Sequence, residues 1–382
     1  MADTPTASRG EFLFTAEQQE LRAAVRRFCA QHFDEATVRT LMESEPRFDR
    51  DVWRRLGTEL GVLGMAVPES DGGAGGSLVD QAVAVEEFGA ALACGPLFGT
   101  VYLAIPALVA CPVGPVRDAL LTALTAGERT AAFDSRPLAE TGGRISGTAA
   151  RVVDADAADV LLVAADGAGV RGVYAVDLNG PGVHRHPLVT MDLTRPQADV
   201  VLDAAPAELL AGPQEADRVV GHALQVGAAL LAVEQVGAAQ HLMDLSVDYA
   251  TSRLQFGRQI GSFQAVKHKL ADMLVDLEHA RSAAYHAVWA LADGSDDPEL
   301  AAGIAQAVCS AAFSRIAADT IQVHGGIGFT WEHQAQLYFK RAATDAALLG
   351  SAEQHRSRVA ELVLDHAVAH PGAVSVATGR PQ

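Results

Sequence analysis

The sequence predicts an α+β protein in which a small β domain separates two helical regions. Two observations carry this prediction. Apolar residues recur at helical spacing from Thr15 to Thr125 and again from Asp217 to Ala369. Between Thr130 and Pro206, short β-rich runs alternate with Gly, Pro, Asp and Asn clusters at roughly 8 to 12 residue spacing, which is typical of a small antiparallel barrel or sandwich. No helical pattern intervenes there, which argues against a doubly wound sheet.

These changes of period divide the chain. We expect an all-helical domain over residues 1–128, a small β-barrel over 129–210, a four-helix bundle over 211–370 and a frayed tail over 371–382. Thr15 and Gln18 have the spacing of a capping box at the start of the first helix. Further helices are expected at Val52–Leu60, Val79–Leu92, Thr100–Val109, Val116–Thr125, Ala223–Ser252, Gln264–Ala292, Glu299–Val323, His333–Leu349 and Ala352–Ala369.

Composition limits the function classes. The 382 residues are 49% hydrophobic and carry a net charge of -18, so nucleic acid would be repelled. The four cysteines, Cys29, Cys94, Cys111 and Cys309, lack CxxC spacing, which indicates a reducing compartment and argues against a metal site. The chain shows neither a signal pattern nor an unbroken apolar run of about 18 residues, so we expect a cytoplasmic protein without a membrane span.

One stretch, Tyr249 to Met273, has residue choices that suit a ligand better than a core. Two helical patterns meet there, and Gly257 and Gly261 bracket the turn, where both can take conformations closed to other residues. Arg253 falls in the last turn of the first helix and Gln264 in the first turn of the second. A guanidinium beside free helix N–H groups suits a diphosphate, although an arginine at a helix C-terminus can also serve the helix dipole alone.

The stretch RLQFGRQIGSFQAVKHKLADM closely resembles the FAD-binding signature of the acyl-CoA dehydrogenase family, and IQVHGGIGFTWEH, from Ile321 to His333, resembles a second motif of that family. The resemblance covers roughly residues 14 to 368. It implies an acyl-CoA dehydrogenase-like fold at whose subunit interface the ADP half of an FAD is held, while the flavin ring belongs to the neighbouring subunit. The cofactor-binding residues implied are Arg253, Gln255, Phe256, Gln264, Gln322, Val323, Gly325, Gly326 and Gln354.

Members of this family oxidise an acyl-CoA to the 2,3-enoyl-CoA, and a carboxylate removes the α proton while a hydride leaves to the flavin. The resemblance places that carboxylate after an R-D-A motif, and counting from Arg341 reaches Gly350. A minority arrangement places it on the long helix before the R-x-x-F-G motif, and counting back from Phe256 reaches Gly227. Neither position carries a catalytic acid.

Other side chains could take the place of the missing catalytic carboxylate. Glu353 could serve if the register is shifted. Glu234 lies about 10 Å along the helix from Gly227, too far for proton abstraction, and is expected to be paired or to lie at the bundle edge. His324 and His333 are expected to be structural. The family's T-E-P-x-x-G-S-D loop and W-I-T-N strand, which face the flavin and thioester, have no counterpart after Phe133.

The sequence therefore predicts a base-less subunit of a heteromeric, FAD-dependent acyl-CoA dehydrogenase, resembling actinobacterial steroid side-chain enzymes built as dimers of heterodimers. A sister subunit would supply the base and acyl pocket, and electron-transfer flavoprotein or a similar protein would accept electrons. Two alternatives stay open: a self-sufficient homotetramer that uses Glu353, and a flavin-free protein that binds an acyl-CoA or a partner.

Overall fold

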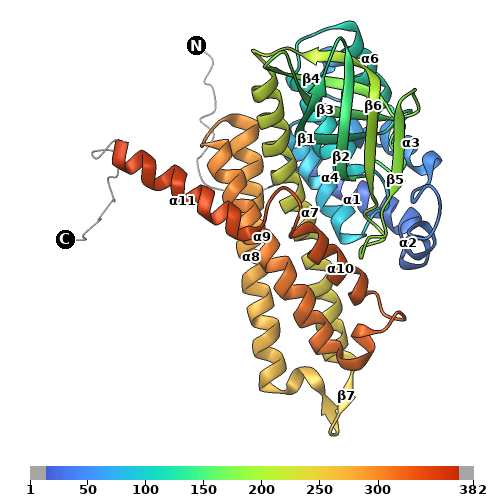
Figure 1. The fold of residues 1–382 in the computed structure, drawn as a ribbon. Helices are drawn as coiled ribbons and strands as arrows, with labels where there is room; N and C mark the ends of the chain where they lie inside the picture. The colour runs from blue at the N-terminus through green and yellow to red at the C-terminus, as the bar shows by residue number, and fades with distance from the viewer. Residues whose placement is uncertain (1–13, 370–382) are drawn as a thin grey trace, which may run out of the picture.

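The longest helix, α7 (Ala216–Ser252), runs through the centre of the computed structural model, which describes residues 14–369 (Figure 1). Every residue from Val226 to Ala239 is buried, as the sequence of Ala223–Val233, apolar almost all round, predicts for a helix in the centre of a bundle. Gly237 lets α7 approach the N-terminal helices closely, because a Cβ there would stand 1.8 Å from the carbonyl oxygen of Glu86. The two helical regions therefore share one core.

The N-terminal region is helical, as predicted. Thr15 and Gln18 form the expected capping box. The sequence did not reveal the short helix α2, and the predicted helix Thr100–Val109 begins earlier, as a buried π-helical segment, η3 (Leu97–Ala104). The helices are α1 (Ala16–His32), α2 (Glu35–Leu41), α3 (Arg50–Thr58), α4 (Leu78–Ala90), α5 (Ile105–Ala110) and α6 (Pro115–Thr125).

The middle region is a six-stranded sheet of order β2-β1-β3-β4-β6-β5, which the additional pairing of β2 with β6 closes into a barrel. Contrary to the antiparallel expectation, β1 and β3 run parallel, because the chain crosses over through β2 before it returns. The strands are β1 (Ala131–Glu140), β2 (Arg144–Val153), β3 (Val160–Gly167), β4 (Val170–Asp177), β5 (Val183–Pro187) and β6 (Gln197–Ala211).

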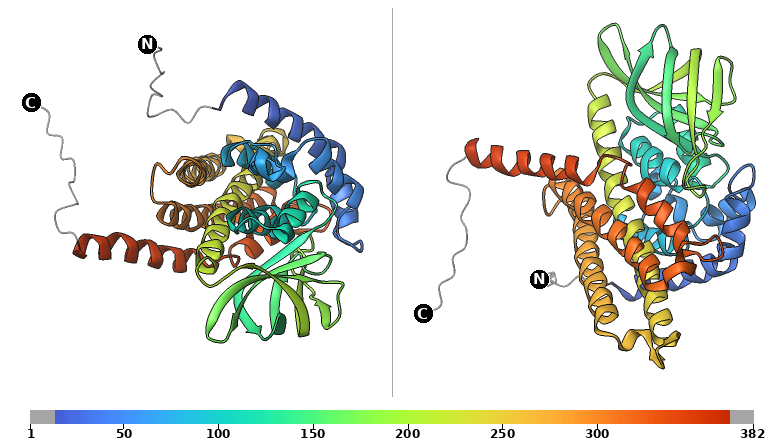
Figure 2. Two further views of the ribbon diagram at one scale, coloured as in Figure 1. Left: turned by 90° about the horizontal axis from the view of Figure 1, so that it is seen from above. Right: turned by 60° about the horizontal axis from the view of Figure 1, so that its bottom comes forward.

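The C-terminal region packs α7 against α8 (Gln264–Asp293) and α9 (Pro298–His324). The next helix, α10 (Ala335–Asp345), is shorter at both ends than the predicted His333–Leu349. The last helix, α11 (Ala352–Ala369), contacts α9 and projects away from the body (Figure 2). The expected tail over 371–382 lies outside the described residues.

Two described segments, Ala216–Ser252 and Pro298–Phe329, are long and apolar enough to cross a membrane by length and composition alone. In their most apolar windows, 72% and 67% of the residues are buried inside the protein. This burial is what the core helices of a globular fold require.

A buried ionic cluster joins the β domain to the helices. The guanidinium of Arg341 on α10 donates to Asp192 Oδ2 (2.7 Å) and Thr194 Oγ1 (2.6 Å), both in the loop between β5 and β6, and also to Glu234 on α7. Arg195, from the same loop, donates to Glu234 as well. The sequence allows Glu234 either to be paired or to lie at the bundle edge. In the structure it is paired, and its side chain is 3% exposed.

Replacing Arg341 tests how strongly this junction is held. Arg341→Met leaves the carboxylates of Asp192 and Glu234 buried with fewer partners, so we expect a loss of about 3–5 kcal/mol in the free energy of unfolding, measured by urea denaturation. Arg356→Ala is the control, because that side chain is 55% exposed and its ion pair with Glu353 is 3.4 Å long. The control loses about 0–1 kcal/mol. Equal losses in both variants would contradict the assigned role of Arg341.

Candidate functional site

The first predicted motif forms a hairpin at the far end of α7. The helix ends at Ser252, and the N–H of its C-cap, Arg253, donates to the carbonyl of Tyr249 (2.8 Å). Two short strands, β7 (Leu254–Gln255) and β8 (Arg258–Gln259), then pair across the turn at Phe256 and Gly257. The hairpin stands at the bottom of the molecule, beyond the helical bundle (Figure 1).

The tip of this hairpin is strained. Phe256 and Gly257 have φ values of +53° and +77°, the geometry of a type I′ turn that usually takes Asn-Gly. Phe256 is also 91% exposed. The prediction that Gly261 takes a conformation closed to other residues was wrong, because its φ is ordinary. A glycine suits this position because a Cβ would stand 2.9 Å from the carbonyl oxygen of Ala250.

The start of α8 lacks its own cap. Its N-cap residue is Phe263, which makes no capping hydrogen bond, and the first turn contains no acidic side chain. Basic residues follow at once, Lys267 to Lys269, although a helix N-terminus favours negative charge. Gln264, the first residue of α8, is exposed. Free helix N–H groups beside lysines form an attractive site for an anion.

The second predicted motif lies where α9 ends. Gly325 caps the helix with φ +65° and ψ -143°, a conformation that favours glycine. Gln322, Gly325 and Gly326 are exposed, and Val323 is partly buried. The segment Gly325–Phe329 continues as a 3-10 turn toward α10.

The fold brings the ends of α7 and α9 together. The rings of Tyr249 and His324 stack with centroids 4.4 Å apart, and Ser246 donates to Thr320 Oγ1 (3.1 Å) one turn earlier. Both pairs tie the first motif to the second, about 70 residues later in the chain. We use the name nucleotide clamp, after the role that the sequence predicts for them, for the eight motif residues Arg253, Gln255, Phe256, Gln264, Gln322, Val323, Gly325 and Gly326.

Gln354 does not belong with these residues. Its amide oxygen accepts from the N–H of Ser351 (2.8 Å), and its own N–H donates to Ser351 Oγ (3.3 Å), so it caps the start of α11. Figures 1 and 2 place that end of α11 far from the β7 hairpin. A role for Gln354 toward the same ligand stays a prediction.

The position predicted for the base, Gly350, lies in the turn between α10 and α11. It has φ +112°, a value unfavourable for any residue with a side chain. A Cβ at Gly350 would stand 3.1 Å from Nε2 of His355, which is itself 3.0 Å from the carbonyl oxygen of Leu349. A side chain at Gly350 would therefore adopt an unfavourable backbone conformation and press against the imidazole of His355.

The alternative position, Gly227, is filled from the opposite side. A Cβ there would stand 2.4 Å from Leu103 Cδ2 and 3.3 Å from the carbonyl oxygen of Tyr102, both on the buried segment η3. A side chain at Gly227 would require the Leu103 side chain to move and would press against the backbone of η3.

The other candidate acids are placed less suitably for proton abstraction. Glu353 lies at the exposed start of α11 and pairs with Arg356 (3.4 Å). Glu234 is committed to Arg195 and Arg341 in the ionic cluster. A base working on a thioester needs a dry pocket and a free carboxylate. Glu353 does not lie in a dry pocket, and the carboxylate of Glu234 is paired with two arginines.

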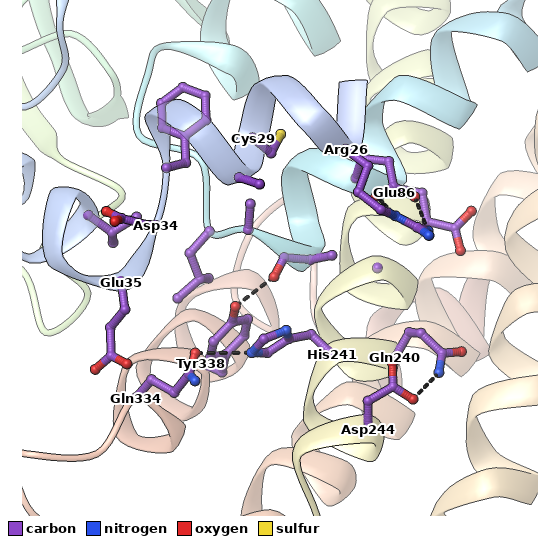
Figure 3. A pocket seen from close by; sticks show the side chains of 18 of the residues that line it. Arg26, Cys29, Asp34, Glu35, Glu86, Gln240, His241, Asp244, Gln334 and Tyr338 are labelled. Atoms are coloured by element: carbon purple, nitrogen blue, oxygen red, sulfur yellow. Dashed lines mark hydrogen bonds and ion pairs between the residues drawn. The ribbon is translucent and has the colours of Figure 1, made fainter. Parts of the chain in front are cut away.

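A pocket of about 940 Å³ lies between α1, α4, α7 and α10 (Figure 3). Its acidic side chains are already paired: Arg22 donates to Glu86 (2.8 Å) and Arg26 to both oxygens of Glu87. His241 stacks on Tyr338 within it and lies 3.0 Å from the amide oxygen of Gln334. Among the described residues no group of His, Cys, Asp and Glu is arranged to hold a metal ion.

The ionic cluster near α10 separates two carboxylates by their pKa values. Burial opposes the ionisation of Glu234, but Arg195 and Arg341 outweigh it and lower its pKa to about 2. Burial raises the pKa of Asp345 to about 7, although Arg195 lies 3.6 Å from its Oδ1. Both oxygens of Asp345 are buried without a hydrogen-bond partner. The cluster thus keeps one carboxylate charged and favours a proton on the other.

Comparison with known proteins identifies the family. Residues 15–128 match the model of the acyl-CoA dehydrogenase N-terminal domain, and residues 218–364 match that of the C-terminal domain. This chain belongs to the acyl-CoA dehydrogenase family. It is 39% identical over 335 residues to the acyl-CoA dehydrogenase IpdE2 of Mycobacterium tuberculosis, a match that covers 88% of this chain and 93% of that one.

Solved structures of this oxidoreductase family share the fold closely. The ChsE4-ChsE5 complex from Mycobacterium tuberculosis contains a chain with a TM-score of 0.85 and 28% identity, covering 94% of this chain and 99% of that one. A variant of the Tcur3481-Tcur3483 steroid ACAD gives a TM-score of 0.84 and 30% identity, covering 92% and 99%. These matches confirm the predicted fold of helical domain, β-barrel and helical domain.

The raised pKa of Asp345 makes a prediction for stability. Below about pH 4 this carboxyl is protonated in both states, and between about pH 4 and 7 the folded state keeps a proton that the unfolded state loses, so stability falls as pH rises. Glu234, whose pKa is lowered, adds stability as the pH rises through its ordinary value near 4.5 and contributes constantly only above about pH 5.5. As the pH rises from about 4.5 to about 7.5, the free energy of unfolding of Asp345→Asn should therefore increase relative to that of the wild type, by on the order of 2 kcal/mol.

Urea unfolding at several pH values measures this difference. Asp51→Asn, at the exposed start of α3, is the matched control and should stay parallel to the wild type. An Asp345→Asn curve that also runs parallel to the wild type would show that the Asp345 carboxyl has no raised pKa.

Proposed function

We propose that this chain is the base-less subunit of a heteromeric, FAD-dependent acyl-CoA dehydrogenase. In this proposal a sister subunit carries the flavin-ring site, the catalytic base and the acyl pocket, and this chain supplies the ADP side of the same FAD site. The observation that carries the proposal is a contrast: seven of the eight residues of the nucleotide clamp are exposed, whereas glycine stands at both base positions, Gly350 and Gly227, with a neighbouring side chain close to each.

The clamp suits the ADP half of FAD on chemical grounds. A diphosphate needs local positive charge and free N–H donors, since the net charge of -18 repels anions at long range. The uncapped start of α8 offers the donors, and Arg253 offers a guanidinium at the end of α7. The exposed Phe256 offers an apolar surface beside them. Gln322 and the Gly325–Gly326 turn complete the set from α9.

When bound, FAD would accept a hydride from the β carbon of the acyl-CoA. The residues of this chain would hold and orient the nucleotide, and the sister subunit would remove the α proton. Glycine stands at both base positions, with His355 close to Gly350 and Leu103 close to Gly227, so this proposal assigns the proton to a base on the sister subunit. Turnover in this proposal requires the sister subunit.

The comparisons support a heteromer and suggest a substrate class. The similar structures include the ChsE4-ChsE5 complex and a steroid ACAD named for two components. We therefore propose a bulky, steroid-like acyl-CoA thioester as the substrate, electron-transfer flavoprotein or a similar protein as the acceptor, and the cytoplasm as the location.

Purification with a sister subunit tests the proposal. The chain should be produced alone and together with acyl-CoA dehydrogenase chains encoded beside it. We expect flavin absorbance at most weakly in the chain alone, and both flavin absorbance and enoyl-CoA formation in a complex. In that complex, Arg253→Ala should weaken FAD retention at least about tenfold, a loss of about 1.4 kcal/mol, whereas Arg356→Ala should not.

Two outcomes would favour the alternatives. Strong flavin retention and turnover by the chain alone would support a self-sufficient homotetramer, and Glu353→Gln should then abolish activity while FAD stays bound. A complex that binds an acyl-CoA without any flavin absorbance would support a non-catalytic binding protein.

The strained hairpin gives a prediction with opposite effects on stability and assembly. Phe256→Asn places a residue that tolerates a positive φ in the type I′ turn, so the chain alone should be unchanged or stabilised by up to about 1 kcal/mol. The same variant removes the exposed ring, so FAD retention by the complex should fall at least about tenfold. Thermal unfolding and FAD titration measure the two effects.

The chain contains a matched control turn. Ala168 and Gly169 join β3 to β4 with φ values of +51° and +82°, so Ala168→Asn makes the same substitution in the same kind of turn, far from the clamp. It should leave FAD retention unaltered. Equal FAD retention in Phe256→Asn and Ala168→Asn would remove Phe256 from the site.

A further inference from the structure

Three aromatic rings contact one another next to the nucleotide clamp, and we call them the stack. His324, the last residue of α9, has Tyr249 of α7 on one side, with centroids 4.4 Å apart and planes 27° apart. His333, in the segment before α10, lies on it at 4.4 Å and 48°. His324 is 4% exposed. The stack therefore joins α7, α9 and the segment that leads to α10.

The hydrogen bonds define the state of both imidazoles. His324 Nδ1 lies 2.8 Å from the carbonyl oxygen of Thr320, so it donates its hydrogen there and Nε2 carries a lone pair. His333 Nδ1 accepts from the N–H of Ala335 (3.2 Å), so its hydrogen is on Nε2. His324 Nε2 is buried without a hydrogen-bond partner. The stack is thus built from two neutral rings, one of which keeps an unused acceptor.

Both halves of the clamp are attached directly to this stack. The N–H of Arg253 donates to the carbonyl of Tyr249 (2.8 Å), and Gly325 follows His324 in the chain. Gly328 folds back over the same histidine, since a Cβ at Gly328 would stand 3.0 Å from His324 Cβ. A tilt of the His324 ring would therefore displace the Gly325–Gly326 turn relative to Arg253.

Charge around the stack is sparse. His324 makes ring contacts with Tyr249 and His333 and a hydrogen bond with the Thr320 carbonyl, and none of these groups is an acidic or strongly basic side chain. Burial lowers the pKa of His324. Burial, and then His324 itself, lowers the pKa of His333, while Arg39 of α2 acts in the same direction and Glu35 in the opposite one. A proton on either ring would place charge in a site built for neutral groups.

We propose that His324 is a positioning residue of the nucleotide clamp, whose neutral ring, held between Tyr249 and His333, fixes the Gly325–Gly326 turn relative to Arg253. This inference rests on the proposed function, because the clamp is the ADP side of the FAD site. His324 does not contact the nucleotide in this proposal. It acts through the backbone that follows it, and protonation of the pair loosens the clamp.

The pH profile of FAD retention in the complex with the sister subunit tests the proposal. From about pH 8 to about pH 5.5, the wild-type complex should lose affinity for FAD about tenfold. His324→Ala removes the ring and should weaken retention about tenfold at every pH. The double variant His324→Phe with His333→Phe keeps the stack without titratable groups, so its retention should stay within about threefold of the wild type at pH 8 and should not change with pH.

His286→Gln is the control, because His286 pairs with Asp296 (3.1 Å) on the exposed side of α8, and its profile should follow the wild type. Histidine NMR of the wild-type complex, with carbon-labelled imidazoles, provides a second readout. Two histidine signals that are absent from the double variant should titrate at lower pH than the signals of the exposed histidines.

The outcomes separate this inference from the proposed function. A wild-type complex that holds no FAD at any pH, or one indifferent to Arg253→Ala, would overturn both. A complex that holds FAD through Arg253 but gives the same pH profile in the double variant and the wild type would overturn the role of His324 alone. If His324→Ala does not fold, the double variant still decides, since it keeps the buried rings.

Discussion

Arg341 and the carboxylates around it determine how the rest of this molecule is arranged. The guanidinium is buried at the meeting point of the β5–β6 loop, α7 and α10, and it donates to a group on each of the first two elements. An arginine in such a place must be paired, because an isolated charge in the interior costs several kcal/mol. The β domain, α7 and α10 are therefore held in one relative position, and the turn that contains Gly350 follows directly from the end of α10.

The two predicted base positions and the hairpin at the end of α7 differ in what their residues contact. Glycine stands at the two positions where the family resemblance predicts a catalytic acid. His355 lies against Gly350, and Leu103 lies against Gly227. At the far end of α7, the hairpin keeps an arginine, an exposed phenylalanine and an uncapped helix start that contribute little to the stability of a single chain. Exposed apolar and basic groups of this kind are retained where they contact a partner or a ligand.

The strain at the hairpin supports the same interpretation. Phe256 accepts a left-handed backbone and leaves its ring in solvent, and both features are unfavourable in an isolated subunit. Near it, the rings of Tyr249, His324 and His333 contact one another, and His324 is buried. In the proposed function the clamp presents its contact residues on this packed base, which would limit the entropy lost when a ligand binds.

The sequence by itself determined the order of helices, barrel and helices, the capping box at Thr15, the buried centre of α7 and the two clamp motifs, because these depend on local periodicity and on residues close together in the chain. It missed α2, which is too short to show a period, and the parallel pairing of β1 with β3, since strand pairing depends on segments far apart. Only the tertiary structure decided that Glu234 pairs with Arg195 and Arg341, that burial raises the pKa of Asp345, and that Tyr249 contacts His324. Burial and long-range contact set those properties, and neither is encoded in the spacing of residues along the chain.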